Sequence, residues 1–303
     1  MAVEQPAARG GWLDVQEVGS LIGMRLMLWI ATVLGRAPVR VVLPAIALYY
    51  AVLHRTARRS SREYLRRMRK PDGFIASYRH MLRFAQCSAD RVFMIQSRHE
   101  LFEVETTGYH HLEGLALRKR GAILLGAHLG SFEAMNAVGV EQGMVVNVVG
   151  YFRNARMINR LLERPGRGVH ARLLEARPGS INFALELREC IERGEFIGIL
   201  GDRAMGGQSV SVDFLGKPAP FPVGAYALAA ILRCPVYLTF GLHRPPNRYE
   251  LHCEPFAEQI VLPRRGRSEA LQGHARRFAR RLEHYCRLAP DNWFNFYDFW
   301  ASW

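Results

Sequence analysis

The sequence predicts an α/β protein in which a mixed, largely buried sheet is flanked by helices, with a membrane-associated helix near the N-terminus. From residue 120 onward, short apolar runs alternate with amphipathic segments, as in α/β proteins. The apolar runs are continuous, which indicates strands that are covered on both faces. A hydrophobic content of 49% over 303 residues is enough for a sizeable core.

The order of the elements predicts one catalytic domain. Strands are expected at 122–128, 145–152, 196–202, 235–243 and 249–256. Helices are expected at 73–97, 131–141, 180–193, 222–232 and 268–288. No composition shift or repeat marks a linker after residue 75. We therefore expect a catalytic domain over residues 71–303, preceded by a helical appendage over residues 1–70.

Two apolar stretches lie within residues 19–53, separated by Gly35-Arg36-Ala37-Pro38. A plain spanning helix needs about 18 uncharged residues, and neither stretch reaches this length because Arg25 and Arg40 interrupt them. We expect a helix, or a kinked pair of helices, that inserts partly or lies at the membrane interface. A true span and two surface helices packed on the catalytic core are the alternatives.

The net charge of +14 predicts an anionic partner, which can be nucleic acid, anionic lipid or an acidic carrier protein. A dense basic run directly follows the apolar segment: Arg55, Arg58, Arg59, Arg62, Arg66, Arg67, Arg69 and Lys70. This pattern is typical of a cytoplasmic membrane surface, and a solvated helix face is the alternative. Nucleic acid is not expected, because such proteins interleave basic residues with exposed aromatics.

Metal and redox motifs are not predicted. His110 and His111 lack a third ligand at a recognised spacing, so we interpret them as part of a loop. The cysteines are odd in number and scattered, which favours buried thiols and a reducing compartment. They are Cys87, Cys190, Cys234, Cys253 and Cys286.

The pattern His-x4-Glu occurs twice, and spacing alone does not distinguish the copies. His128 and Glu133 form the first copy, and His170 and Glu175 form the second. The second copy has no turn between its members and lies in a basic stretch. We interpret it as a surface segment or an anion contact.

The first copy has the local context of a catalytic site. His128 follows an apolar strand, and Gly130 and Ser131 then supply a turn and a helix N-cap. Residues five apart on a continuous helix point about 140° away from one another, so a contact between His128 and Glu133 needs such a bend.

An imidazole is the suitable base for removing a hydroxyl proton at neutral pH. We therefore expect His128 to activate a hydroxyl as a general base, while Glu133 accepts a hydrogen bond from the other ring nitrogen.

Two further loops follow predicted strands at the edge where α/β proteins bind ligands. Asp202 and Arg203 follow the strand at 196–202, and Arg203 is a candidate for stabilising an oxyanion while Asp202 holds it. A structural salt bridge between them is the alternative. Arg153 and Asn154 are candidates for binding an anionic group, with solvated loop residues as the alternative.

The chain resembles the bacterial lipid A biosynthesis acyltransferases, the late lauroyl/myristoyl transferase group. The resemblance rests on motifs spread over most of the length: Gly35-Arg36-Ala37-Pro38, Ser61-Arg62-Glu63-Tyr64-Leu65, His128-x4-Glu133, Gly201-Asp202-Arg203, Asp213-Phe214-Leu215-Gly216, and Pro222-Val223-Gly224 to Pro235-Val236. Family members close to lipid A often carry Asn and Trp where this chain has Ala127 and Phe132. The aromatic ending at 293–300 is more similar to relatives from aryl polyene and xanthomonadin pigment clusters.

This resemblance implies a glycerolipid-acyltransferase-like fold and a protein on the cytoplasmic face of the inner membrane. It implies acyl-carrier protein as thioester donor, a hydroxyl of a lipid or lipid-like acceptor, and neither metal nor cofactor. The alternative function is a non-catalytic basic protein that binds a membrane surface or nucleic acid.

Overall fold

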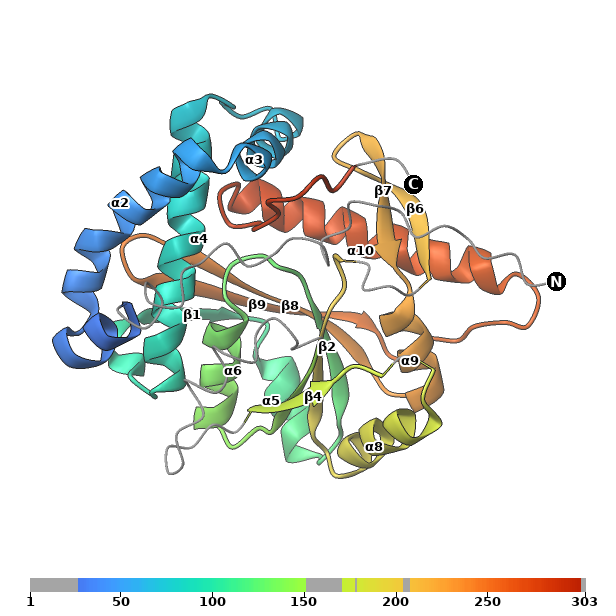
Figure 1. The fold of residues 1–303 in the computed structure, drawn as a ribbon. Coiled ribbons are helices and arrows are strands. Elements are labelled where there is room, and N and C mark those ends of the chain that lie inside the picture. Colours follow the sequence, from blue (N-terminus) through green and yellow to red (C-terminus); the bar gives the residue numbers. More distant parts are fainter. Residues whose placement is uncertain (1–26, 151–170, 178, 204–207, 301–303) are drawn as a thin grey trace.

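The computed structural model describes residues 27–150, 171–177, 179–203 and 208–300, and its centre is a seven-stranded mixed sheet (Figure 1). In sheet order the strands are β1 (Glu103–Thr107), β9 (Arg248–Ala257), β8 (Val236–Arg244), β2 (Ala122–Gly126), β5 (Phe196–Leu200), β3 (Val146–Gly150) and β4 (Ala171–Glu175). Neighbouring strands are parallel except β8 and β9, which form an antiparallel hairpin. The predicted mixed sheet is thus confirmed.

The expected helices are confirmed to within two residues at each end. The helices are α2 (Arg36–Leu53), α3 (Arg55–Arg67), α4 (Phe74–Ile95), α5 (His110–Leu117), α6 (Phe132–Glu141), α8 (Ile181–Glu192), α9 (Gly224–Leu232) and α10 (Arg267–Leu288). Ser180 caps α8 by accepting a hydrogen bond from the backbone N–H of Phe183.

The central strands of the sheet are buried on both faces, as their continuous apolar sequences predict. Along β2, Ile123 and Leu125 point into a core shared with α8, α9 and α10. Leu124 points to the opposite face, where Leu112 and Leu115 of α5 pack against it. The five cysteines are buried and unpaired, as expected.

Four strands were not expected from the sequence. β1 is fully exposed and polar at the sheet edge, so it carries no apolar signal. β6 (Ser209–Phe214) and β7 (Lys217–Pro222) form a separate hairpin, and the prolines of β7 obscure its strand character. β4 is the opposite edge strand of the main sheet.

One local interpretation is corrected by these elements: His110 and His111 are not in a loop, since they begin α5. The segment that ends at Glu175 lies at the surface, as interpreted, because it forms the edge strand β4, in which Arg172, Leu173 and Glu175 are exposed. His170 lies outside the described residues.

The N-terminal apolar segment forms the kinked pair of helices that the sequence predicts, within the described residues. A short helix over Ile30–Leu34 ends at Gly35, whose φ of 87° breaks the chain direction before α2. α2 packs along α4 (Figure 1). By length and composition α2 is able to cross a membrane, with a mean hydropathy of 1.4.

A buried carboxylate fixes α2 to α4. Asp90 of α4 is fully buried and binds Arg36 at 2.9 Å and Arg40 at 2.6 Å. The hydroxyl of Tyr249 on β9 donates a third hydrogen bond to Asp90, at 3.0 Å. Two arginines and one phenol therefore depend on one charge.

Asp90→Asn should lower the free energy of unfolding by about 3 kcal/mol, because it leaves two largely buried guanidinium groups without their counter-charge. Chemical unfolding of the purified protein measures this loss. Asp72→Asn is the matched control, since its pair with Arg66 is exposed and should contribute less than about 1 kcal/mol. Equal losses for the two variants would contradict the structural role of Asp90.

α3 belongs to the core as well as to the N-terminal segment. Tyr64, Leu65 and Met68 are buried in the same cluster as the central strands. Its other faces carry the basic run predicted from the sequence. The division into an appendage over residues 1–70 and a catalytic domain over residues 71–303 stays a prediction. The side chains of α3 pack into the same core as the sheet.

Candidate active site

The parallel pairing of β2 and β5 brings His128 and Asp202 together. Gly126 and Leu200 are partners at the ends of the two strands, and the N–H of Gly201 donates to the carbonyl of Gly126 at 2.9 Å. The backbone continues in the same register beyond both strands, so the second residue after β2 lies beside the second residue after β5. His128 and Asp202 occupy these two positions.

A direct hydrogen bond joins the His128 ring to the Asp202 carboxylate. The distance from Nδ1 to Oδ1 is 2.8 Å, and the backbone N–H of His128 donates to Oδ2 at 3.0 Å. The Asp202 side chain is only 1% exposed, whereas the His128 side chain is 30% exposed. The carboxylate is therefore sealed in the protein, while the ring is accessible at one side.

Burial and nearby charges set the protonation of the pair. Burial alone would raise the pKa of Asp202, but His128, Arg203 and the Trp293 N–H together lower it to about 2. Burial, and then Arg203, lowers the pKa of His128 below its ordinary value, and Asp202 opposes this effect. Around neutral pH the ring is neutral and donates from Nδ1, so Nε2 carries the lone pair that accepts a proton.

The C-terminal segment closes around this pair. The indole Nε1–H of Trp293 donates to Asp202 Oδ2 at 3.0 Å. The N–H of Phe294 donates to the carbonyl of His128 at 2.8 Å, and the carbonyl of Asn292 accepts from Gly130 at 2.8 Å. Trp293 is fully buried, so the aromatic tail up to residue 300 packs on the sheet.

A fully buried histidine, His80, supports Trp293 from behind. His80 Nε2 lies 2.9 Å from the carbonyl of Trp293, and its Nδ1 lies 3.0 Å from Ser61 Oγ. Burial lowers the pKa of His80 to about 4, so the ring is neutral. Because a carbonyl only accepts, Nε2 must carry the proton and the hydroxyl of Ser61 donates to Nδ1. His80 thus holds the backbone of Trp293 on α3, and the indole of the same residue holds Asp202.

Glu133 occupies a different position from the one expected. Its Oε1 lies 2.8 Å from Nε of Arg91 on α4, and the ring nitrogen Nδ1 of His128 binds Asp202 instead. The expectation that Glu133 accepts the hydrogen bond of His128 is therefore corrected. The predicted N-cap is confirmed, because Ser131 Oγ accepts from the N–H of Ala134 at 3.2 Å. Glu133 stays close enough for its charge to raise the pKa of His128.

Arg203 lies beside the pair and is held by the C-terminal segment. Its Nη2 donates to the carbonyl of Phe294 at 2.6 Å, and its guanidinium stands 5.5 Å from the ring centre of Tyr297. Among the described contacts its buried Nε has no hydrogen-bond partner. Asp202 binds His128 and Trp293, so neither the expected hold of Asp202 on Arg203 nor the alternative salt bridge between them occurs among the described contacts. The candidates Arg153 and Asn154 lie outside the described residues.

Trp293→Phe should raise the pKa of His128. The indole N–H withdraws charge from Asp202, and its loss leaves more negative charge beside the imidazolium. A larger fraction of the ring is then protonated below neutral pH. An NMR titration of the His128 ring between pH 4 and 8 measures the shift.

Trp300→Phe is the matched control for this variant. Trp300 is also buried and also donates its indole N–H, but to the carbonyl of Phe214 at 3.3 Å. Its replacement removes the same atoms without touching Asp202. An equal shift in both variants, or a shift in neither, would show that the Trp293 N–H does not tune the pair.

Comparison with known families places this site inside a matched region. The sequence profile described as "Bacterial lipid A biosynthesis acyltransferase" matches residues 76–302, which include His128, Glu133, Asp202 and Trp293. No curated protein is similar enough to count as a match. Members of this family are transferases that move acyl groups. Because the match covers most of its 303 residues, the chain belongs to the bacterial lipid A biosynthesis acyltransferase family.

Proposed function

We propose that the protein transfers a fatty acyl group from acyl-carrier protein to a hydroxyl of a membrane lipid or lipid-like acceptor, with His128 as the general base. The observation that carries this proposal is the hydrogen bond between His128 Nδ1 and the buried, ionised Asp202. It leaves a neutral, accessible Nε2 inside the region that matches the family.

The proposed reaction begins when Nε2 of His128 takes the proton of the acceptor hydroxyl. The oxygen attacks the thioester carbonyl and forms a tetrahedral intermediate. Collapse of this intermediate breaks the carbon–sulfur bond, and the imidazolium returns the proton to the departing thiolate. An ester and the free carrier thiol are the products, and no cofactor or metal takes part.

Each neighbouring group has a proposed role in these steps. Asp202 fixes the tautomer of His128 and stabilises the imidazolium. Arg203, whose Nε has no hydrogen-bond partner in the described part of the chain, stabilises the oxyanion. Glu133, held by Arg91, contributes negative charge that favours proton uptake by His128. Arg153 and Asn154 remain candidates for binding an anionic group of the acceptor or carrier.

The proposed location is the cytoplasmic face of the inner membrane, where an acidic carrier protein and a lipid acceptor both have access. The net charge of +14 supports anionic partners of this kind. Membership of the pigment-cluster subgroup stays a prediction.

Acyl transfer from a radiolabelled acyl-carrier protein to a bacterial lipid extract tests the function. We expect a labelled lipid whose acyl group is released by mild alkali, as an ester requires, and its mass identifies the acceptor. Mock extract without lipid is the control for hydrolysis. A protein that binds the extract but produces neither labelled lipid nor free carrier thiol would support the non-catalytic alternative.

A further inference from the structure

α2 presents an apolar stripe to its surroundings, where a helix on the surface of a soluble domain carries polar residues. Seven positions along one side of α2 are exposed, and none of them is charged: Val41, Val42, Ala45, Leu48, Tyr49, Val52 and Leu53. Val41, for example, is 78% exposed. Such a contiguous apolar surface indicates an apolar partner.

The opposite side of α2 packs against the rest of the protein. Val39 and Leu43 are buried against Phe93 of α4. Arg36 and Arg40 hold the first turns of α2 on the buried Asp90, which is itself bound to β9. A spanning α2 would carry this ionic network into hydrocarbon, which is costly. The packing therefore leaves one side of α2 available to lipid rather than its whole circumference.

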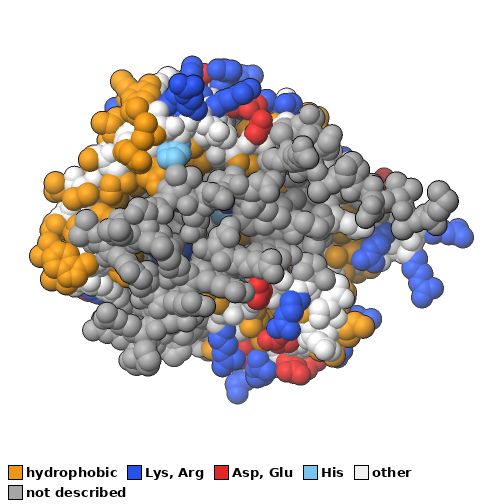
Figure 2. Space-filling view, in the orientation of Figure 1, with side chains coloured by type: hydrophobic (Ala, Val, Ile, Leu, Met, Phe, Trp, Pro, Cys, Tyr) orange, Lys and Arg blue, Asp and Glu red, His pale blue; other side chains and the backbone are white. Residues whose placement is uncertain are grey.

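The basic helix α3 adjoins this stripe. Arg58 donates to the carbonyls of Ala51 and Val52 at the end of α2, which fixes the junction between the two helices. Figure 2 shows apolar side chains along the edge where α2 lies, next to Lys and Arg side chains over α3. Apolar and positive surfaces thus meet at one corner of the molecule.

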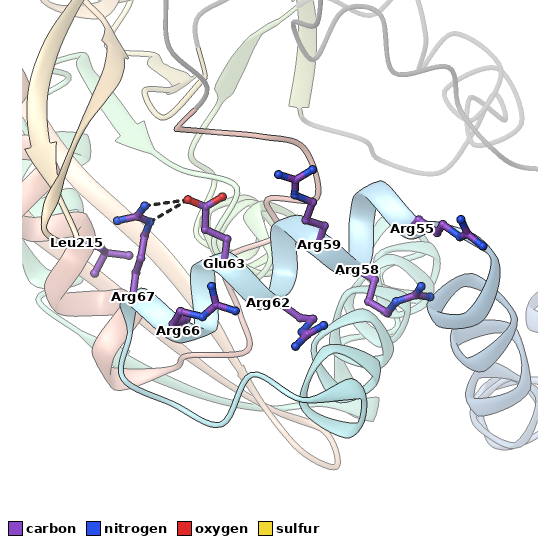
Figure 3. A pocket seen from close by; sticks show the side chains of 8 residues that line it. All are labelled: Arg55, Arg58, Arg59, Arg62, Glu63, Arg66, Arg67 and Leu215. Carbon is purple, nitrogen blue, oxygen red and sulfur yellow. Dashed lines mark hydrogen bonds and ion pairs between the residues drawn. The ribbon is translucent and has the colours of Figure 1, made fainter.

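A pocket of about 840 Å³ follows α3, and six of the eight residues that line it are arginines (Figure 3). It contains neither residue of the catalytic pair. Arg55 and Arg59 are exposed and have no ion-pair or hydrogen-bond partner among the described contacts. The lining residues are Arg55, Arg58, Arg59, Arg62, Glu63, Arg66, Arg67 and Leu215.

We propose that α2 and α3 form one docking surface on which α2 lies parallel to an anionic bilayer, with its apolar stripe in the interface and the α3 arginines at lipid phosphates. The inference rests on the proposed membrane location and adds the mode of attachment. Phosphate is the complementary partner of guanidinium groups. A second copy of the chain would instead oppose one positive cluster to another.

Nitroxide depth measurements distinguish this arrangement from a span. Single cysteines at Val41, Ala45, Leu48 and Val52 are labelled in the full-length protein on phosphatidylglycerol-containing vesicles, and the native cysteines are buried. A helix in the interface places all four labels within a few ångströms of one depth, roughly 5–10 Å below the headgroup boundary. Leu117, which is 86% exposed on α5, is the control position and stays in water.

Three results would overturn the proposal. Depths that differ by about 16 Å between Val41 and Val52, as 1.5 Å per residue requires, would show that α2 spans the bilayer. Labels that remain in water on vesicles would show that the stripe of α2 does not enter the bilayer. Labels that are protected without vesicles, while the protein dimerises, would show that a second copy of the chain covers the stripe. Because no acyl transfer is measured, none of these results depends on the catalytic proposal.

The arginines are tested by vesicle co-sedimentation. Arg55→Gln combined with Arg59→Gln should weaken binding to anionic vesicles about 30-fold, since each surface arginine contributes roughly fivefold, which corresponds to about 1 kcal/mol. Arg276→Gln combined with Arg280→Gln removes two exposed charges from α10 and should have a much smaller effect. Equal losses would mean that net charge, rather than the α3 surface, drives binding and would refute the assignment.

Discussion

His128→Ala is expected to lower kcat/KM for acyl transfer by about 10²- to 10⁴-fold, the range typical of losing a general base. The variant removes the accessible ring nitrogen Nε2, which is free to take up a proton because Nδ1 is the atom that binds Asp202. The residual rate should also lose the acid limb, since no group with the pKa of His128 remains to be protonated.

His110→Ala is the matched control, because His110 is an exposed histidine on α5 and does not belong to the pair. Equal folded yield of both variants is checked by circular dichroism, and initial rates are compared with the same labelled carrier. If His128→Ala retains more than about a tenth of the wild-type rate, His128 is not the base and the mechanism proposed above fails.

Asp202→Asn is expected to lower kcat/KM by about as much as His128→Ala does. Two N–H groups, from His128 and Trp293, point at Oδ2, so an oxygen must remain at that position in the amide. The amide nitrogen is then forced into the place of Oδ1 and donates to Nδ1 of the ring. This moves the ring proton to Nε2 and removes the lone pair that accepts the substrate proton, as a wrong tautomer does in hydrolytic triads.

Glu133→Gln distinguishes the contribution of the Glu133 carboxylate from that of Asp202. Its loss removes charge that raises the pKa of His128, so the acid limb should move to lower pH. Because Glu133 binds Arg91 rather than the ring, we expect a loss on the order of tenfold, smaller than for Asp202→Asn. A larger loss for Glu133→Gln than for Asp202→Asn would return the role of direct partner to Glu133.

Glu133 and Asp202 show which features of the site neighbouring residues predict and which depend on contacts between distant parts of the chain. The sequence identifies His128 because the signals are local: an apolar strand, a glycine turn and a serine cap within a few residues. It also places Asp202 after a strand, but it does not reveal that β5 lies beside β2. Once that adjacency is known, the equal register of Gly126 and Leu200 predicts the contact of His128 with Asp202.

Trp293 had no local signal for its role at all. Its indole reaches Asp202 across 91 positions of sequence, through a segment whose aromatic composition indicates only packing. His80 also has no sequence pattern that indicates its role, because an isolated histidine in an amphipathic helix is usually a core residue. Their functions depend on hydrogen bonds that exist only after α3, α4 and the C-terminal segment have met.

The sequence by itself determined the α/β class, the five covered strands, the helices that flank them and the position of the candidate base. These features follow from the periodicity of apolar residues and from turn and cap chemistry, which act over short stretches. Only the tertiary structure decided which carboxylate serves His128, what holds that carboxylate, and which side of α2 remains exposed. Each of these depends on strand order and helix packing, which join residues that are distant in the chain.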